Sequence, residues 1–263
     1  MQKTVRALKK SRGAFLTCFI LGLLLVLLAA AFSLYTNATK VEVFEAALQE
    51  ADVNELLDIV LSSANVPGLS GGVTKGLNLT DSIATPEALS AFAQDTIDYL
   101  VGEVDEWKPT VAVMGFEVPI PISEDFMTHM KDVKNWVSIG QKVFYALLAV
   151  CGVLLLRLIA SSRCHFSGAG YYLGVILPLA IVGGIIAWAY FDFEGFWMFI
   201  HEHFIKGGIF SNGEVVMRIF TTDMFKTFIR PIVTTFAMLL GGIVLLPIVI
   251  APLSKIRQGR SQY

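Results

Sequence analysis

Four long stretches of the chain carry no Asp, Glu, Lys or Arg, and they constrain the fold more than any other feature. These stretches are 13–39, 143–156, 164–191 and 231–254. Three of them reach the roughly 20 residues that are needed to cross about 30 Å of hydrocarbon. The shorter second stretch lies between Lys142 and Arg157, whose long side chains can carry their charges to the membrane surface. The chain therefore contains four predicted transmembrane helices, at 14–35, 139–160, 170–190 and 231–253.

The composition agrees with a membrane protein and excludes a disordered one. Hydrophobic residues make up 55% of the chain, charged residues only 16%, and the mean hydropathy is +0.65. A soluble domain carries about 25% charged residues, and a disordered chain combines low hydrophobicity with high charge. We therefore predict a mainly α membrane protein, with four transmembrane helices and a small extracytoplasmic α+β cap.

The charges predict which side of the membrane each loop occupies. Segments 1–13, 161–169 and 254–263, together with Arg157 at the end of the second span, hold ten basic residues and no acidic ones. Segment 36–138 holds seventeen acidic and five basic residues, and segment 191–230 holds five acidic and four basic ones. Because basic residues concentrate in cytoplasmic loops, both termini are predicted to be cytoplasmic.

The first hydrophobic stretch allows a second interpretation. A basic start, an apolar run and the alanines of 29–31 are also typical of a cleavable secretory signal. The uncharged run continues to Thr39, which is longer than a usual signal core. We therefore expect a retained helix at 14–35.

The two extracytoplasmic segments have helical and hairpin patterns. The spacing of apolar residues predicts a helix over 41–66, and Thr85 with Pro86 predicts the start of a second helix that ends near Val104. The β-branched stretch 111–122 predicts a short hairpin or an edge strand. Ser123 is a predicted N-cap of a helix that can run directly into the second span. Segment 191–230 has a hairpin signal of its own, an Asn-Gly pair at 212–213.

His129 and Asp132 form a candidate acid–base pair. On a helix these residues are i,i+3 neighbours on one face, and a carboxylate beside an imidazole raises its basicity. A surface ion pair explains the same spacing. The predicted extracytoplasmic segments 36–138 and 191–230 contain no cysteine, so no thiol nucleophile is available there. The predicted spans hold no Asp, Glu or His, which argues against a coupled transporter or proton pump.

His129, His201 and His203 together offer three imidazoles, enough for a catalytic zinc. The geometry of a helix argues against a zinc site formed by these three histidines. Two residues on a helix are separated by about 200°, so His201 and His203 cannot both face one metal if 196–205 is helical. A zinc-dependent membrane hydrolase stays the weaker alternative, and we expect no metal site.

Two stretches resemble motifs of a bacterial family of four-span membrane proteins that includes the lipoprotein intramolecular transacylases (Lit). Segment 126–137 resembles the family's His-x-x-Asp-Val-Lys motif. Segment 199–204, with the Asn-Gly turn and Arg218 beyond it, resembles the second outer motif, although Ile200 stands where the family has Phe. The resemblance covers mainly 98–255.

The resemblance implies an acyltransferase. Lit-type enzymes move an acyl chain from the diacylglyceryl group of a lipoprotein to the amine of its N-terminal cysteine, which gives a lyso-form lipoprotein. The family's essential histidines correspond to His129 and His201. Asp132 would orient His129, and Lys134 or Arg218 would support the oxyanion. The expected partners are a diacylglyceryl-modified lipoprotein and the lipid bilayer, with no nucleic acid and no cofactor.

A non-enzymatic membrane protein remains the competing class. In that reading the acidic extracytoplasmic domain binds a partner, and the histidines are ordinary interfacial residues. Segment 36–138 has a charge balance of −12, from seventeen acidic and five basic residues, which suits a basic partner and also keeps a domain soluble.

Reporter fusions test the predicted topology. A reporter at Arg163 should report the cytoplasm, because the loop 161–169 is basic, and a reporter at Gly208 should report the opposite side. The same location for both fusions would contradict the four-span arrangement.

Overall fold

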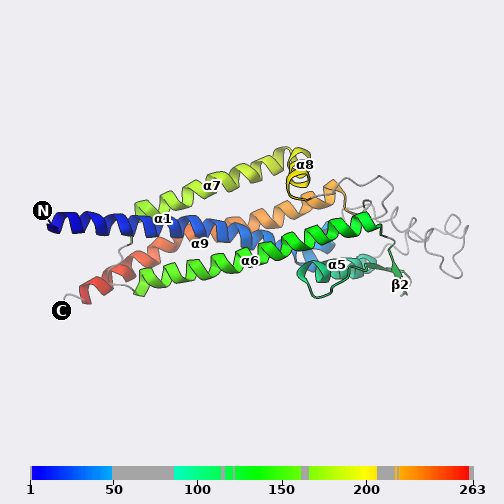
Figure 1. The fold of residues 1–263 in the computed structure, drawn as a ribbon, viewed down its shortest axis with the longest axis horizontal. Helices are drawn as coiled ribbons and strands as arrows, with labels where there is room; N and C mark the ends of the chain where they lie inside the picture. The colour runs from blue at the N-terminus through cyan, green and yellow to red at the C-terminus, as the bar shows by residue number, and fades with distance from the viewer. Residues whose placement is uncertain are drawn as a thin grey trace, which may run out of the picture. The chain divides into compact units, whose positions relative to one another are not determined.

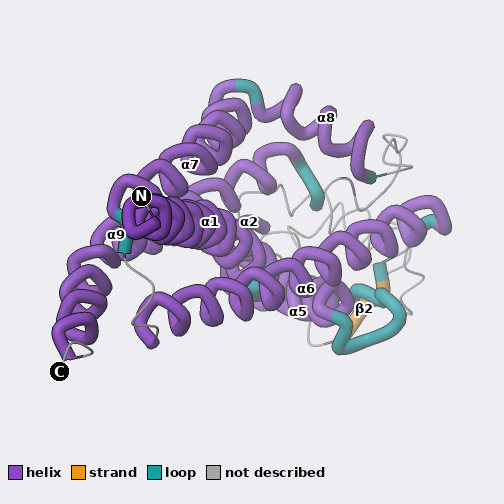
Figure 2. The backbone as a smooth tube through the Cα atoms, turned by 60° about the vertical axis from the view of Figure 1, so that its left-hand side comes forward, coloured by secondary structure: helices purple, strands orange, loops and turns teal. Residues whose placement is uncertain are grey.

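The computed structural model describes residues 2–48, 86–113, 116–120, 122–160, 166–205, 217 and 219–260. Helices make up most of this part of the chain, with a single pair of short strands among the described residues (Figure 2). In chain order the elements are α1 (Gln2–Ala38), α2 (Val41–Leu48), α5 (Pro86–Val101), β1 (Thr110–Val113), β2 (Phe116–Pro119), α6 (Glu124–Ala160), α7 (Gly168–Phe191), α8 (Phe193–Phe204) and α9 (Thr222–Arg260).

Four of these helices, α1, α6, α7 and α9, are long and apolar enough to cross a membrane, which is the predicted number. The chain divides into two compact units. The membrane unit comprises Met1–Leu34, Gly140–Trp188 and Val233–Tyr263, and the cap unit comprises Tyr35–Ile139 and Ala189–Ile232. Within the membrane unit, the two termini lie at the same end (Figure 1), as an even number of spans requires.

Helix α1 provides the centre of the membrane unit. In the apolar 18-residue stretch of α1, 33% of the residues are buried within the protein, whereas the corresponding stretches of the other three candidate spans are 11–22% buried. Side chains from all four spans meet at its buried face. The buried members are Cys18, Leu21, Leu25, Val26 and Ala29 of α1, Cys151 and Leu158 of α6, Tyr171 and Val175 of α7, and Phe236 and Ile243 of α9.

Glycines let α1 and α7 pack backbone to backbone. A Cβ placed on Gly170 would meet the carbonyl oxygen of Phe15, one on Gly174 would meet that of Phe19, and one on Gly22 would meet that of Tyr171. In lipid, where helices gain nothing from excluding water, such small residues permit the close approach that makes packing favourable. The spacing of four residues between Gly170 and Gly174 keeps both on one face of α7.

Two hydrogen bonds fix α7 against other parts of the membrane unit. The buried Tyr171 hydroxyl donates to the carbonyl oxygen of Ile243 on α9 at 2.7 Å. The Ser167 amide, just before α7, donates to Cys18 Sγ on α1 at 3.2 Å. Polar groups within a membrane need hydrogen-bond partners inside the protein, because lipid chains provide none.

Trp107 is the centre of the cap unit. Its ring is fully buried and packs on Phe92, Tyr99 and Phe126, with ring centroids 5.8–6.3 Å apart. Its Nε1–H donates to the Thr96 hydroxyl at 3.2 Å, so the one polar atom of the buried indole has a partner. The same core continues into α2, β1, β2, α6 and the start of α9, through Phe44, Leu48, Val111, Val118, Met130 and Met224.

The sequence-based elements of the cap are confirmed where the structure describes them. Helix α5 begins at Pro86 and ends at Val101, and Gly102 follows it with a φ of 89°, which suits glycine. The stretch predicted as a hairpin or edge strand forms an antiparallel pair, with Thr110 opposite Pro119. Thr110 is tied to α5, because Asp95 Oδ2 accepts from its amide and hydroxyl at 2.9 Å each.

Helix α6 begins as predicted and runs without interruption into the second span. The Ser123 hydroxyl accepts from the Phe126 amide at 3.1 Å, which is the N-cap geometry. The helix has 37 residues, about 55 Å, whereas the hydrocarbon layer is about 30 Å thick. Its first turns therefore extend beyond the span predicted at 139–160. The predicted helix beyond Leu48 and the hairpin at Asn212 lie outside the described residues.

The contact between α1 and α7 can be tested with two glycines of α7. Gly174→Leu should lower the melting temperature of the purified protein in detergent, because the new side chain forces the backbones apart at a cost of at least about 1–3 kcal/mol. Gly183→Leu is the matched control, since a Cβ there meets nothing within 4 Å in the described structure. Equal melting temperatures for the two variants would contradict the close packing.

Candidate active site

His129 lies in the second turn of α6, with its ring against the aromatic core of the cap unit. The residue is 9% exposed. Its ring centroid is 5.6 Å from that of Phe126, which itself stacks on Trp107 at 5.8 Å. The Ser123 cap fixes where the helix begins and therefore which side of it faces the core. His129 is thus held by the packing of the whole cap core.

His201 lies on α8, in a column of rings. Asp192 caps this helix by accepting from the Gly195 amide at 3.0 Å. Phe193, Trp197 and His201 then follow at intervals of four residues, so they share one face. Their successive ring centroids are 5.6 and 4.5 Å apart. Phe225 of α9 also packs on this column, with its ring centroid 4.2 Å from that of Trp197.

The two histidines meet inside the cap unit. Their ring centroids are 5.8 Å apart, and the ring planes are inclined by only 13°. The residues are far apart in sequence, so this contact depends on how α8 packs against the first turns of α6. Two imidazoles at this separation can act on one bound group and influence each other's charge.

The tautomer of His201 follows from its hydrogen-bond partner. Its Nδ1 lies 2.9 Å from the carbonyl oxygen of Trp197. A carbonyl oxygen only accepts, so Nδ1 carries the hydrogen and, in the neutral ring, Nε2 carries the lone pair. His201 therefore presents a basic nitrogen whose orientation is set by α8 itself.

His129 is held in its neutral form. Burial, together with the charge of His201, lowers the pKa of His129 from 6.5 to about 4, while Asp132 acts in the opposite direction. A neutral imidazole both donates and accepts one hydrogen bond. At neutral pH His129 can therefore donate a hydrogen bond to a developing negative charge without itself carrying a positive charge.

The other predicted site residues have different surroundings. Asp132 is half-buried on α6, near enough for its charge to act on His129. Lys134 lies about 140° around the helix from His129. Its ammonium group donates to the carbonyl oxygen of Val104 at 2.8 Å and lies 4.3 Å from the centre of the Tyr99 ring. Lys134 thus ties α6 to the segment that follows α5, and Arg218 lies outside the described residues.

His203 does not join the pair. It lies on another face of α8, exposed, where Nδ1 is 2.9 Å from the Phe199 carbonyl oxygen and its ring packs on Phe199 at 4.3 Å. Because α8 is helical, His201 and His203 point to different sides. The described residues contain no group of three or more His, Cys, Asp or Glu side chains that could hold a metal ion.

Comparisons with known proteins identify the family. The family model described as lipoprotein intramolecular transacylase Lit matches residues 14–225. The chain belongs to the Lit family. A solved structure, the membrane-integral lipoprotein intramolecular transacylase Lit from Bacillus cereus, has the same fold, with a TM-score of 0.60 and 14% identity over 94% of this chain and 99% of that one. No curated protein sequence matches.

Membership of the Lit family makes the chain a multi-pass membrane acyltransferase. The family match extends from the first span to Phe225, and so it includes both α6 and α8. It also includes the segment 49–85, which lies outside the described residues.

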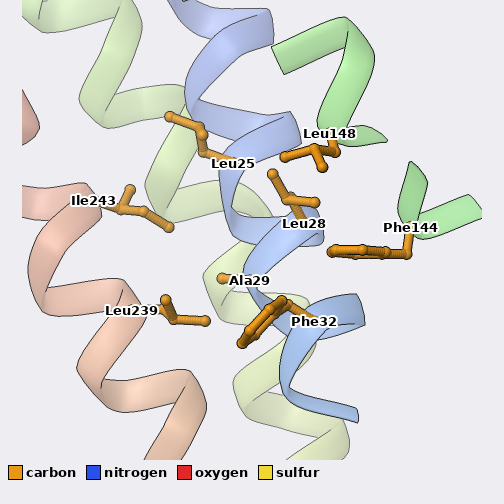
Figure 3. A pocket seen from close by; sticks show the side chains of 8 residues that line it. All are labelled: Leu25, Leu28, Ala29, Phe32, Phe144, Leu148, Leu239 and Ile243. Carbon is orange, nitrogen blue, oxygen red and sulfur yellow. The ribbon is translucent and has the colours of Figure 1, made fainter. Parts of the chain in front are cut away.

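The membrane unit of this Lit-family protein contains an apolar pocket of about 320 Å³. Its side chains come from α1, α6 and α9 and point toward one another across the space between these helices (Figure 3). The lining residues are Leu25, Leu28, Ala29, Phe32, Phe144, Leu148, Leu239 and Ile243. A pocket lined only by hydrocarbon side chains suits an apolar group such as a lipid chain.

Sequence reasoning missed the residues that hold the two imidazoles. The aromatic residues of 191–204 have the composition expected at a membrane interface, yet Trp197 packs against the ring of His201. The spacing of Phe193, Trp197 and His201 carried the signal, because on a helix it places three rings on one face. The contact of Trp136 with Phe204 joins two distant segments, and no local pattern indicates it.

The depressed pKa of His129 can be measured by NMR. The Cε1 proton of this ring should titrate with a midpoint near pH 4, because burial disfavours the charged form. Asp132→Asn should lower the midpoint further, and His201→Ala should raise it. The stability contributed by neutral His129 should be complete above about pH 6.5 and decline as the pH falls toward 4. A midpoint near 6.5 would contradict this environment.

Proposed function

We propose that the protein transfers one acyl chain from the diacylglyceryl group of a lipoprotein to the α-amine of that lipoprotein's N-terminal cysteine. The products are an N-acyl cysteine and a monoacylglyceryl thioether, the lyso form. The observation that supports this proposal best is the stacked pair His129 and His201. Membership of the Lit family supports the class of reaction.

The reaction requires proton transfer and charge stabilisation. The neutral amine attacks the ester carbonyl carbon, which becomes tetrahedral and carries a negative oxygen. The attached nitrogen then loses a proton, the bond to the glycerol oxygen breaks, and that oxygen gains a proton. One proton is removed and one is returned, so a single imidazole can carry it from nitrogen to oxygen.

We assign the proton transfer to His201. Its Nδ1–H is held by the Trp197 carbonyl, which leaves Nε2 free to take the proton from nitrogen and return it to the glycerol oxygen. His201 is more exposed than His129, so a substrate can reach it.

We assign stabilisation of the oxyanion to His129. Because its pKa is about 4, its ring stays neutral at the pH of the reaction and acts as a hydrogen-bond donor. A positively charged His201 next to it disfavours a second positive charge, which keeps the two roles separate. A donor held in place by a packed core needs no reorganisation when the charge develops.

The proposal needs no protein nucleophile. The amine and the ester belong to one molecule, so holding them in contact replaces a bimolecular encounter with an intramolecular one, worth several kcal/mol. Asp132 would support the orientation of His129. Lys134 contacts Val104 and Tyr99, and its support of the oxyanion stays a prediction from the family motif. Arg218 remains a candidate for that role from the sequence alone.

The membrane places both reactants near the histidines. His129 lies ten residues before the predicted span 139–160, which is about 15 Å along α6. The ester of a diacylglyceryl group lies near the surface of the hydrocarbon layer. With both termini in the cytoplasm, as the basic residues predict, this reaction would take place at the outer surface of the bacterial cell membrane.

Substitution of the histidines tests the proposed function. His129→Ala and His201→Ala should each abolish formation of the lyso form in cells, since loss of acid–base or oxyanion support costs about 10²–10⁴-fold in rate. Asp132→Asn should lose less activity. The measurement is mass spectrometry of a host lipoprotein's N-terminal peptide, with and without each variant.

His203→Ala is the matched control, because His203 is on the same helix and points away from the pair. It should retain most activity, without added zinc. Undiminished formation of the lyso form by either His129→Ala or His201→Ala would refute the mechanism. Activity that chelation removes and zinc restores would favour the metal-dependent alternative.

A further inference from the structure

The end of α8 is held by a side chain from another helix. Trp136 of α6 donates from its Nε1–H to the carbonyl oxygen of Phe204 at 2.7 Å. Phe204 is the last residue of α8, and His201 is three residues before it. The hydrogen bond is thus made within the same turn that carries His201.

That turn needs an external partner. The last four carbonyl groups of a helix receive no hydrogen bond from N–H groups of the same helix, and short helices fray from their ends. Helix α8 has 12 residues, and Ile205 follows it in an extended conformation, with φ −121° and ψ 99°. The chain therefore leaves the helical conformation at Ile205. The indole N–H of Trp136 satisfies the terminal carbonyl.

The same indole also makes a ring contact. The Trp136 and Phe204 rings meet edge to face, with centroids 5.7 Å apart and planes inclined by 82°. Trp136 follows His129 by seven residues, two helical turns, so both lie on one face of α6. Helix α8 is therefore held against that face at two places: by the stacked imidazoles and by the contact of Trp136 with Phe204.

We propose that Trp136 is a positioning residue, which sets the separation of His129 and His201 by capping the end of α8. The inference deepens the proposed function and rests on it for its activity measurements. Trp136 acts through Phe204 and the last turn of α8, without touching either imidazole in the contacts described above.

The alternative role for Trp136 is that of an ordinary aromatic residue at the membrane interface. It is 43% exposed and Phe204 is 47% exposed, as expected for rings at a membrane surface. The direction of the N–H favours positioning, because an interfacial tryptophan donates to water or lipid, whereas this one donates to a helix-terminal carbonyl. High exposure also means that the contact contributes little to the core, unlike the buried Trp107.

Two substitutions separate the hydrogen bond from the ring. Trp136→Phe keeps an aromatic ring and removes the donor, while Trp136→Gln supplies an N–H donor without the ring. Trp188→Phe is the matched control, because it is the same change at a half-exposed position on α7 in the membrane unit. The measurements are kcat and KM on a diacylglyceryl lipopeptide, the melting temperature, and amide hydrogen exchange along α8.

Trp136→Phe should lower kcat by about three- to tenfold, the effect of one lost hydrogen bond, and leave KM unchanged. Amide exchange should accelerate by a similar factor at the end of α8, with unchanged exchange in α5 and an unchanged melting temperature. Trp136→Gln should recover part of both losses, and Trp188→Phe should resemble the unsubstituted protein.

The proposal is overturned if Trp136→Phe matches Trp188→Phe in both kcat and exchange at α8. It is also overturned if KM rises while kcat and exchange stay constant, since that result indicates contact with substrate or lipid. If the unsubstituted protein forms no lyso product, the proposed function fails, and the exchange data still decide whether Trp136 caps α8.

Discussion

The contact between the imidazoles of His129 and His201 depends on the packing of two helices that start in different parts of the chain. Each ring has its own support: Phe126 and the cap core lie against His129, and Trp197 with Phe225 lies against His201. The contact therefore exists only while the cap core, α8 and the start of α9 are all packed. A site built on helices in this way holds its groups more precisely than one built on loops.

Burial gives the two imidazoles different properties. His129 is buried and its pKa falls to about 4, whereas His201 is less buried and holds its Nδ1 on a helix carbonyl. Two chemically identical side chains are thereby suited to different tasks, a neutral hydrogen-bond donor and a proton carrier. Differences of environment commonly separate an acid from a base in this way.

The fold could largely be predicted from the sequence, because local patterns determine where the helices lie. Uncharged stretches predict the spans, and Ser123 and Pro86 mark helix starts that the structure confirms. The resemblance to the Lit family singled out His129 and His201. Nothing local, by contrast, links Trp136 to Phe204, and the aromatics of α8 have the composition expected at a membrane surface. Lys134 was assigned to the oxyanion by its place in the motif, whereas its turn of α6 directs it to Val104 and Tyr99.

The central claim is that His129 and His201 act as one catalytic unit, and a double-mutant cycle tests it most directly. Residual rates of acyl transfer would be measured by mass spectrometry for His129→Ala, His201→Ala and the double variant, at equal amounts of folded protein. When two residues act together in one step, removing either one already removes the contribution of both. The account predicts that the double variant is little slower than the slower single variant. A double variant whose loss equals the product of the two single losses would show that the histidines act independently, and would contradict the account.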